Sequence, residues 1–447
     1  MSCSWVEVTI DSIKSSNKNA IAMGPFGSRI KADNFVSSGV PILKGGNLHQ
    51  AYINDSVCDF LTEEKADELM SSNATIGDIV ITHRGTIGQV SIIPYNARFK
   101  RYVVSQSQLK ISVDETKANP YYINYFLRSP LGQHRLLLNA SQVGVPAIAR
   151  ATKSIKDIEI PLPPLFIQNK IENILTTLDN KINNNIKIKQ TLEQIAQTLF
   201  KSWFVDFDPV KAKMEGRQPE GMDAETAALF PDKFVESELG LIPEGWAVSN
   251  MSKHFNIIMG QSPKGESYNE EGIGVPFFQG RKDFDFRFPN VRVFTSEPKR
   301  FANKDDTIIS VRAPVGDKNM TAIKCCIGRG LAAIKHKSNS RSFTYYFVSH
   351  IESSLINKGS SGTVFSSINK KDLEQTYFIV PSDEVIEAFH KLIDPIDEKI
   401  LVLTKQIKNL SNIRDTLLPK LLSGELDVSN LDTQDILNDV ESELEAS

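Results

Sequence analysis

The stretch GDIVITHRGTIG at residues 77–88 returns, with the same spacing of apolar and turn residues, as DDTIISVRAPVG at residues 305–316. Arg84 then corresponds to Arg312, and Gly88 corresponds to Gly316. In each copy a short β-branched run leads into an arginine and a glycine-containing turn, which is typical of a strand that ends in a loop. An internal repeat of this kind decides the fold class.

Further matched segments extend the repeat over most of the 447 residues. They include Trp5 with Trp246, Gly39-Val40-Pro41 with Gly274-Val275-Pro276, Tyr121-Tyr122 with Tyr345-Tyr346, and Asp179-Asn180-Lys181-Ile182 with Asp397-Glu398-Lys399-Ile400. Each copy begins with about 150 residues of short β-branched and aromatic runs separated by Gly, Pro, Asn and Ser, which predicts strands and loops. Each copy then ends in a helical pattern.

The helical pattern of the first copy has neither Gly nor Pro from Ile167 to Ser202, and its apolar residues recur every three or four positions. In a heptad frame, position a holds Ile171, Leu178, Leu192 and Leu199, and position d holds Ile174, Ile188 and Ile195. The second copy places Phe389, Ile396, Leu403, Leu410 and Leu417 at a, and Leu392 and Ile413 at d. We expect an antiparallel coiled-coil pair that separates two globular heads.

These patterns predict an α+β protein with two β-rich heads, two long helices and a pseudo-twofold internal repeat. The expected boundaries are head 1 at 1–164, helix 1 at 165–205, a linker at 206–244, head 2 at 245–381, helix 2 at 382–424, and a disordered acidic tail at 425–447. The tail holds eight acidic residues and no basic one.

Charge and composition narrow the function classes. The formal net charge is −3, but residues 246–380 hold 19 Lys and Arg against 12 Asp and Glu. Local basic surface, and not the charge of the whole chain, sets attraction to phosphate. No apolar run reaches the roughly 18–20 residues of a membrane span, and the first residues do not resemble a signal peptide. Four cysteines without CxxC spacing favour reduced thiols in a cytoplasm over a disulfide framework or a zinc site.

No catalytic motif emerges from the sequence. Asn119-Pro120-Tyr121-Tyr122 is close to an amino-methyltransferase motif but lacks its second proline, and no glycine-rich cofactor loop precedes it. No GxxxxGK[ST] phosphate loop occurs, and the seven His residues show no metal-ligand spacing. We expect a binding subunit that is not an enzyme.

A family resemblance rests on long motifs. The run LFKSWFVDFDPVKAKMEGRQPEGMDAETAALFPDKF at 199–234 resembles the central region of the DNA specificity subunits of type I restriction–modification systems. ELGLIPEGW at 238–246 is similar to the entry into their second recognition domain, and IPLPPLFIQNKI at 160–171 and LLPKLLSGELDV at 417–428 resemble the segments at either end of their long helices. The proline-rich segment that leaves the first head, IPLPP at 160–164, is replaced in the second copy by Val380-Pro381-Ser382-Asp383.

The resemblance implies that each head is a target recognition domain that reads one half of a split double-stranded DNA site. The helices would set the gap between the half-sites and dock two methyltransferase subunits, which are joined by restriction and translocation subunits. This chain would bind no cofactor itself, because S-adenosylmethionine, ATP and Mg²⁺ would lie on the partners.

Polar and basic residues on the expected loops are the candidate DNA contacts, with plain surface turns as the alternative. In head 1 they are Ser28, Arg29, Lys44, Asn47, His83, Arg84, Ser105, Gln106, Gln108 and Gln142. In head 2 they are Lys264, Gln279, Arg281, Lys282, Arg312, Arg329, Ser360 and Ser361. Arg84 and Arg312 are the best candidates because the repeat places both at a strand end, although a structural salt bridge would also explain them.

The aromatic run that ends helix 1 has two interpretations. Phe200, Trp203, Phe204 and Phe207 would form either core packing or an exposed patch for a partner protein. Their place at the helix end where the family docks methyltransferases favours partner binding.

Three other functions compete with a specificity subunit. A fused restriction enzyme is disfavoured by the missing catalytic motifs, and a purely structural scaffold is disfavoured by the basic heads. A stand-alone regulator that binds a split operator without a methyltransferase fits the repeat equally well, and only the resemblance separates it.

Overall fold

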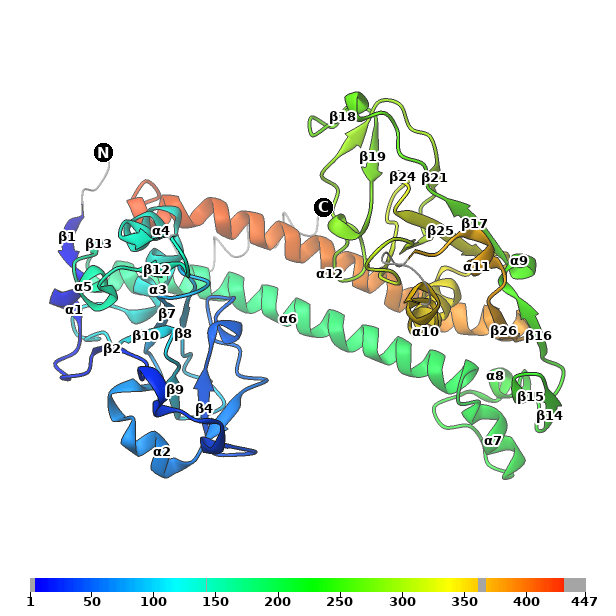
Figure 1. Cartoon of the computed structure of the whole chain (residues 1–447), viewed down its shortest axis with the longest axis horizontal. Coiled ribbons are helices and arrows are strands. Elements are labelled where there is room, and N and C mark those ends of the chain that lie inside the picture. The colour runs from blue at the N-terminus through cyan, green and yellow to red at the C-terminus, as the bar shows by residue number, and fades with distance from the viewer. Residues whose placement is uncertain (1–4, 142, 361–366, 430–447) are drawn as a thin grey trace. The chain divides into compact units, whose positions relative to one another are not determined.

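The computed structural model describes residues 5–141, 143–360 and 367–429 of the chain. It divides into two compact units: unit 1 ends at residue 184 and resumes at residue 406, and unit 2 holds residues 185–405. Each unit contains one β-rich head and part of each of two long helices, α6 (Leu165–Phe204) and α12 (Asp383–Ser423) (Figure 1). The predicted α+β class with an internal repeat is confirmed.

Head 1 is built on two sheets. The first is antiparallel, in the order β2 (Ile21–Met23), β10 (Gln108–Ile111), β7 (Ile79–Thr82) and β8 (Val90–Ile92). The second has the order β3 (Phe35–Val36), β5 (Asp59–Leu61), β4 (Val40–Leu43), β9 (Arg101–Val104) and β6 (Asn73–Thr75). In it β4 and β9 run parallel, with Leu43 opposite Val104. Strands β4, β7 and β10 are buried along their whole length, as expected of short β-branched runs between turns.

Head 2 repeats this topology strand for strand. Its antiparallel sheet has the order β17 (Phe255–Met259), β25 (Leu331–His336), β22 (Thr307–Ser310) and β23 (Lys318–Met320). Its five-stranded sheet has the order β18 (Tyr268–Asn269), β20 (Phe294–Thr295), β19 (Val275–Phe278), β24 (Cys325–Ile327) and β21 (Phe301–Ala302). Again the third and fourth strands run parallel, with Phe278 opposite Ile327.

Each head is closed by a ribbon that joins its first and last strands. In head 1, β1 (Val6–Thr9) pairs with β13 (Glu159–Leu162), and in head 2, β16 (Ala247–Asn250) pairs with β26 (Tyr377–Val380). The last strand leads at once into a long helix. The remaining helices are α1 (Ile10–Ile13), α2 (Glu63–Glu68), α3 (Pro120–Arg128), α4 (Pro130–Leu137) and α5 (Ala151–Lys156) in head 1, and α9 (Met251–His254), α10 (Arg341–Ser360) and α11 (Lys370–Glu374) in head 2.

The long helices pack antiparallel within unit 2. Glu193 of α6 and Asp397 of α12 bind the same arginine, and seven residues further along α6 the ring of Phe200 lies 5.8 Å from that of Phe389. The buried positions of α6 include a row with a spacing of seven that continues through both units. This row consists of Leu175, Ile182, Lys189, Ala196 and Trp203.

The expected heptad frame is therefore wrong in part. Ile188 and Ile195, expected at d, are 45% and 43% exposed, and Leu392 of the second copy is 46% exposed. Each helix packs against a head as well as against the other helix, so its buried arc is wider than a two-helix seam and is centred one position away.

Residues 206–244, expected as a linker, are folded into unit 2. They form α7 (Asp208–Met214), α8 (Ala224–Ala228) and a hairpin of β14 (Phe234–Ser237) with β15 (Gly240–Pro243). The aromatic run that precedes them packs against this segment and against α10 and α12. The tail beyond residue 429 lies outside the described residues.

The aromatic run is core, and the prediction that it binds a partner is wrong. Phe200, Trp203, Phe204 and Phe207 are each at most 9% exposed. The Trp203 ring lies 5.2 Å from that of Phe230, the Phe204 ring lies 5.1 Å from that of Phe389, and the Phe207 ring lies 5.8 Å from that of Trp246. Phe230 of the folded segment, Phe389 of α12 and Trp246 supply the apolar partners that the sequence alone did not assign, so these four rings form no exposed patch.

No helix in the described ranges combines the length and apolarity that crossing a membrane would need.

The pH dependence of folding should reflect a buried histidine in unit 2. His336 of β25 is packed against Phe255 and Phe343, and its Nδ1 accepts a hydrogen bond from the backbone N–H of Ser338. Burial, with a smaller contribution from His254, lowers the pKa of His336 to about 4. Between that value and the unfolded pKa of about 6.5, the unfolded chain binds a proton that the folded chain does not. The free energy of unfolding should therefore decrease by at most about 3 kcal/mol as the pH is lowered through this range. Denaturant titrations from pH 7 to pH 4.5 measure it.

The His336→Asn variant isolates this effect. Whatever its stability at pH 7, it should lose less stability on acidification than the wild-type chain. The matched control is His134→Asn, which alters an exposed histidine of α4 and should follow the wild-type profile. Equal pH slopes for wild type and His336→Asn would contradict the assignment.

Candidate nucleic-acid interface

The parallel strand pair of head 1 brings four loops to one edge of the head. The backbone N–H of Ser105, just after β9, donates to the carbonyl of Leu43 at the end of β4 at 3.0 Å. His83, just after β7, donates to the carbonyl of Ser107, and Gly24, just after β2, donates to that of Gln108, both at 2.9 Å. Loops 24–29, 44–47, 83–84 and 105–108 are therefore neighbours, and we call them loop edge 1.

Head 2 builds the same edge with matching hydrogen bonds. Gly328 donates to Phe278 at 2.8 Å, Val311 donates to Gly330 at 2.9 Å, and Gly260 donates to Leu331 at 2.9 Å. Loops 260–264, 279–282, 312 and 328–330 are neighbours in consequence, and we call them loop edge 2. Each loop of loop edge 1 thus has a counterpart at the equivalent place of loop edge 2.

A close backbone approach fixes the first loop of each edge. A Cβ added at Gly24 would lie 1.9 Å from the carbonyl oxygen of Ser105, and one added at Gly260 would lie 2.1 Å from that of Gly328. Because no side chain fits there, both positions require glycine. The loops that follow carry Arg29 in edge 1 and Lys264 in edge 2.

Several cations on the two edges point into solvent. Arg29 and Arg84 in edge 1 are exposed, and within the described ranges neither forms an ion pair. The same is true in edge 2 of Lys282, Arg312 and Arg329. The salt-bridge alternative for Arg84 and Arg312 therefore has no support among the described residues. An unpaired, exposed guanidinium is available to phosphate or to a guanine edge.

The backbone around the two matched arginines is also the same. The backbone of Arg84 forms an isolated antiparallel β-bridge with Ala147 of β12 (Ala147–Ile148), and β12 pairs with β11 (Ala140–Ser141). The backbone of Arg312 forms the same kind of β-bridge with Ser367. The next residue in each partner segment, Ile148 or Ile368, donates a backbone hydrogen bond of 2.9 Å to the residue before the arginine.

Three predicted contacts in edge 1 support the loops instead of facing solvent. Asn47 is buried; its Oδ1 accepts from the backbone N–H of Lys44 at 2.9 Å, and its Nδ2 donates to the carbonyl of Asn54 at 2.7 Å. Gln108 is buried and donates from Nε2 to Thr82 Oγ1 at 3.2 Å. His83 is also buried, and burial lowers its pKa, which favours the neutral ring. Asn47 and Gln108, which are held by these partners, cannot reach DNA unless the loop unfolds, and His83 is withdrawn from solvent by burial.

The other predicted residues of edge 1 remain accessible. Gln106 is exposed, and Ser105 is half-buried and hydrogen-bonded to Gln108. Lys44 is exposed but forms an ion pair with Asp59. Exposed ion pairs of this kind contribute little to stability, so Lys44 can exchange Asp59 for a phosphate at small cost.

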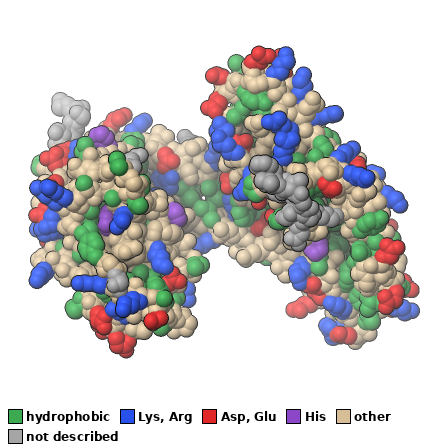
Figure 2. Space-filling model, viewed as in Figure 1, with side chains coloured by type: hydrophobic (Ala, Val, Ile, Leu, Met, Phe, Trp, Pro, Cys, Tyr) green, Lys and Arg blue, Asp and Glu red, His purple; other side chains and the backbone are tan. Residues whose placement is uncertain are grey.

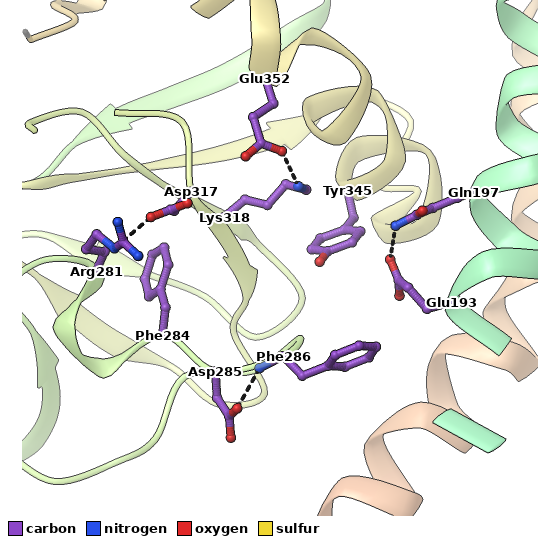
Figure 3. Close-up of a pocket in the computed structure, with 10 residues that line it drawn as sticks. All are labelled: Glu193, Gln197, Arg281, Phe284, Asp285, Phe286, Asp317, Lys318, Tyr345 and Glu352. Atoms are coloured by element: carbon purple, nitrogen blue, oxygen red, sulfur yellow. Dashed lines mark hydrogen bonds and ion pairs between the residues drawn. The ribbon is translucent and has the colours of Figure 1, made fainter. Parts of the chain in front are cut away.

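In edge 2, Gln279 is exposed and Arg281 is held by Asp317, with Nε and Oδ2 2.7 Å apart. Figure 3 shows this pair at one side of a cavity of about 330 Å³, with the ion pair of Lys318 and Glu352 at 2.6 Å beside it. The Lys264 ammonium lies 3.6 Å from the Glu266 carboxylate at the surface.

A second hollow of about 340 Å³ adjoins edge 2. Gln279, Arg281 and Lys282 line it together with Tyr268 and Arg292, two residues that the sequence analysis missed. The Tyr268 ring lies 4.8 Å from that of Phe277, and the Arg292 guanidinium is paired with Glu270 at 2.8 Å. The only sequence signal for them was their place in segments that flank the predicted loops.

Side chains at four predicted positions cannot be placed. Gln142 and Ser361 lie outside the described residues, and the side chains of Ser28 and Ser360 are likewise outside them.

Lys and Arg residues outnumber Asp and Glu residues in head 2, with 19 against 12 over residues 246–380. Figure 2 shows Lys and Arg side chains over the part of unit 2 where Figure 1 places β18, β19 and β21. Within the described ranges, no three His, Cys, Asp or Glu side chains come together in a way that could hold a metal ion.

Comparisons with known proteins agree on one family. The model of the type I restriction modification DNA specificity domain matches twice, at residues 27–194 and 243–411. A Methanocaldococcus jannaschii protein, provisionally named the MjaX specificity subunit of a type I restriction enzyme, is 32% identical over 87% of this chain and 88% of its own length. The HindI specificity subunit of Haemophilus influenzae is 30% identical over 77% of this chain and 87% of its own length.

A solved structure shares the fold. The S subunit of a type I restriction–modification system from M. genitalium superposes with a TM-score of 0.61 over 93% of this chain and 96% of that chain, at 20% identity. The two family matches coincide with the two structural repeats. The chain therefore belongs to the family of type I restriction–modification DNA specificity subunits, which are non-catalytic.

Proposed function

We propose that this chain reads a two-part double-stranded DNA site, with loop edge 1 on one half-site and loop edge 2 on the other. The observation that carries the proposal is the duplication of one edge architecture, with an exposed arginine at the same place in each copy that forms no ion pair with any described residue. Two reading edges on one chain imply two specific sequences separated by bases that are not read, because each half-site must meet its own edge.

The chemistry of the edges suits DNA. Exposed Lys and Arg supply the salt-dependent attraction to phosphates, and this attraction carries no sequence information. Exposed Arg29, Arg84, Gln106, Gln279 and Arg329 can supply base contacts, since Arg pairs with guanine and Gln with adenine in the major groove. The buried side chains of Asn47 and Gln108 then contribute indirectly, because their hydrogen bonds hold the loops in shape.

We further propose that the long helices set the gap between the half-sites and dock two methyltransferase subunits. Within the described ranges, six large apolar side chains stand exposed on them: Leu165 and Phe166 at the start of α6, Ile188 and Ile195 further along it, and Leu392 and Val402 on α12. Exposed apolar residues along helices are candidates for association with partner helices. The partners would carry S-adenosylmethionine for adenine methylation, and restriction subunits would bring ATP and Mg²⁺. The assembly would act in the cytoplasm, where its DNA lies.

The test of the whole proposal is adenine-methylation sequencing of the host genome with and without this gene. Deletion should abolish methylation at one gapped, two-part motif and should leave all other methylated motifs unchanged. Unchanged methylation in a strain that expresses the chain would contradict a role in modification and would favour a split-site regulator.

Arg84→Ala should weaken recognition of one half-site, and Arg312→Ala should weaken recognition of the other. A lost base contact should cost about 1–3 kcal/mol and relax specificity at one base pair. A lost phosphate contact should weaken binding to all sequences and should lower the slope of log K against log salt by about 1. Binding titrations of the complex at several salt concentrations, on DNA with either half-site altered, measure both quantities.

Arg98→Ala is the matched control for Arg84→Ala. Arg98 is exposed and lies just before β9, whereas loop edge 1 follows the end of that strand. It should keep wild-type binding. If Arg84→Ala and Arg312→Ala affected the same half-site, one edge could not serve each half-site.

Ile188→Asp combined with Ile195→Asp should prevent co-purification with the methyltransferase while leaving the chain folded. Both side chains are already more than 40% exposed, so their replacement removes little buried area from the chain itself. Gln194→Asp, at an exposed position of the same helix, adds one negative charge where the double variant adds two, and serves as the control. Normal co-purification of the double variant would exclude this face as the docking surface.

A further inference from the structure

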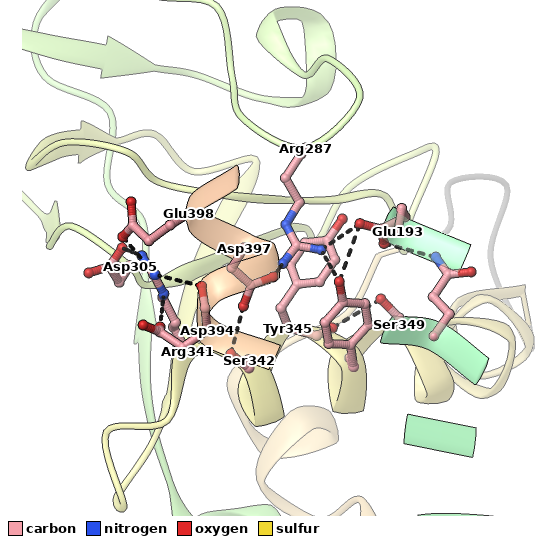
Figure 4. A network of polar contacts seen from close by, with 12 residues as sticks. Glu193, Arg287, Asp305, Arg341, Ser342, Tyr345, Ser349, Asp394, Asp397 and Glu398 are labelled. Carbon is pink, nitrogen blue, oxygen red and sulfur yellow. Dashed lines mark hydrogen bonds and ion pairs between the residues drawn. The ribbon is translucent and has the colours of Figure 1, made fainter. Parts of the chain in front are cut away.

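One fully buried arginine holds head 2 on both long helices. Arg287 lies in the loop between Asp283 and β20. Its Nη1 donates to Glu193 Oε2 of α6 at 2.7 Å and to Tyr346 Oη of α10 at 3.0 Å, and its Nη2 donates to Asp397 of α12. Figure 4 shows the guanidinium between Glu193 of α6 and Asp397 of α12. A single side chain of the head is thus tied to α6 and α12 together.

The Tyr345 ring and the Ser342 hydroxyl restrict where the Arg287 guanidinium and its Asp397 partner can lie. Its Cζ lies 3.5 Å from the centroid of the Tyr345 ring, and the second oxygen of Asp397 accepts a hydrogen bond of 2.6 Å from Ser342. Burial alone would lower the pKa of Arg287, but Asp397 and the other nearby groups more than offset it, so the pKa lies above its usual range and the cation persists.

The loop that carries Arg287 is held at both sides. Met320 of β23 donates a backbone hydrogen bond of 2.8 Å to the carbonyl of Arg287, and Asn319 Nδ2 donates to the carbonyl of Asp285 at 2.8 Å. The neighbouring Phe286 ring lies 4.6 Å from Lys189 Nζ, one turn of α6 before Glu193. Lys189 and Glu193 together therefore clamp the loop to a defined turn of α6.

Arg341 adds a second connection between head 2 and α12. It is 7% exposed, with Nε 2.7 Å from Asp394 Oδ1 and Nη2 2.7 Å from Glu398 Oε1. These two acceptors are more exposed than Glu193 and Asp397, so solvent screens the Arg341 contacts more strongly. The ion pairs of Arg287 therefore hold head 2 more firmly than those of Arg341 do.

Head 1 meets its helices in a different way. Asp179, which the repeat matches to Asp397, accepts from Tyr125 Oη of the head at 2.7 Å and from Arg414 of α12 at 2.8 Å. Here the head contributes a neutral hydroxyl, and the arginine comes from a helix. Among the described residues, the charged side chain of a head that binds both helices is Arg287 of head 2.

We infer that Arg287 is a positioning residue that fixes the orientation of head 2 on its helices and so makes the chain reject half-sites with a wrong gap. The inference rests on the proposed function. One added base pair moves a half-site by about 3.4 Å and turns it by roughly 35°, so a head must reorient to follow it. Reorientation would separate a buried cation from two buried carboxylates, which is strongly unfavourable.

The test uses Arg287→Met in the full chain, expressed with the host methyltransferase. Methyl-adenine sequencing gives the ratio of methylation at motifs whose gap is one base pair longer or shorter to methylation at the normal gap. In the variant this ratio should rise about tenfold or more, while the bases preferred in both half-sites stay the same. Arg341→Met should raise the ratio less, and the exposed control change Arg217→Met, in the folded segment 206–244, should leave it unchanged.

A purely structural role predicts other results. Loss of specificity for the second half-site, or a wild-type gap ratio in a folded Arg287→Met chain, would overturn the inference. If Arg287→Met does not fold, Tyr346→Phe removes one hydrogen-bond partner of Arg287 and Glu193→Gln removes the negative charge of another, and an unchanged gap ratio in both would overturn it as well. Absence of any gapped motif in the wild type would instead refute the proposed function.

Discussion

A buried carboxylate on each long helix is the constraint on which the arrangement of each unit depends. Asp179 and Asp397 lie at matched places of the repeat, and both are almost fully withdrawn from water. A carboxylate in such a place is stable only when charged or hydrogen-bonding groups meet it in good geometry. The head that packs on the helix must supply some of these groups, so satisfying the carboxylate also determines how the head sits. The chain solves the same problem twice with different residues, through Tyr125 and Arg414 in unit 1 and through Arg287 and Ser342 in unit 2.

The loop edges depend on a second constraint, the parallel strand pair in each head. Parallel strands end at the same side of a sheet, so the residues after β4 and β9, or after β19 and β24, have to be neighbours. The glycines at 24 and 260 let another loop approach this point closely. Buried polar side chains such as Asn47 then hold the loops, and the exposed side chains between them are free to differ. A rigid frame with variable exposed residues is suited to recognition.

The sequence predicted those features that are written locally. Helical periodicity and flanking prolines placed the long helices at 165–205 and 382–424, and the structure has them at Leu165–Phe204 and Asp383–Ser423. The repeat placed Arg84 and Arg312 at equivalent strand ends. Features that depend on residues far apart in the chain were not predicted. Nothing in the sequence near Ile188 indicates that a head packs on the neighbouring face of the helix and leaves Ile188 exposed. Likewise, nothing near Asn47 or Gln108 indicates that their side chains are hydrogen-bonded within the head. Arg287, within the aromatic segment FDFRF, reads as an ordinary surface arginine until Glu193 and Asp397 are brought to it from about 100 residues away on either side.

The division of the chain into units also has a consequence for its synthesis. Unit 2 is continuous, so every residue that it needs has been made once residue 405 has left the ribosome. Unit 1 is not, because the helical segment beginning at residue 406 completes it. At translation rates of about 5–20 residues per second, the apolar face of the first part of α6 waits roughly 10–45 s for its partner. During that time Ile171 and Leu175, which are fully buried in the finished unit, have only head 1 to cover them. The nascent chain therefore passes through a period in which the first half of the protein is vulnerable to aggregation and depends on chaperones or on rapid synthesis of the second.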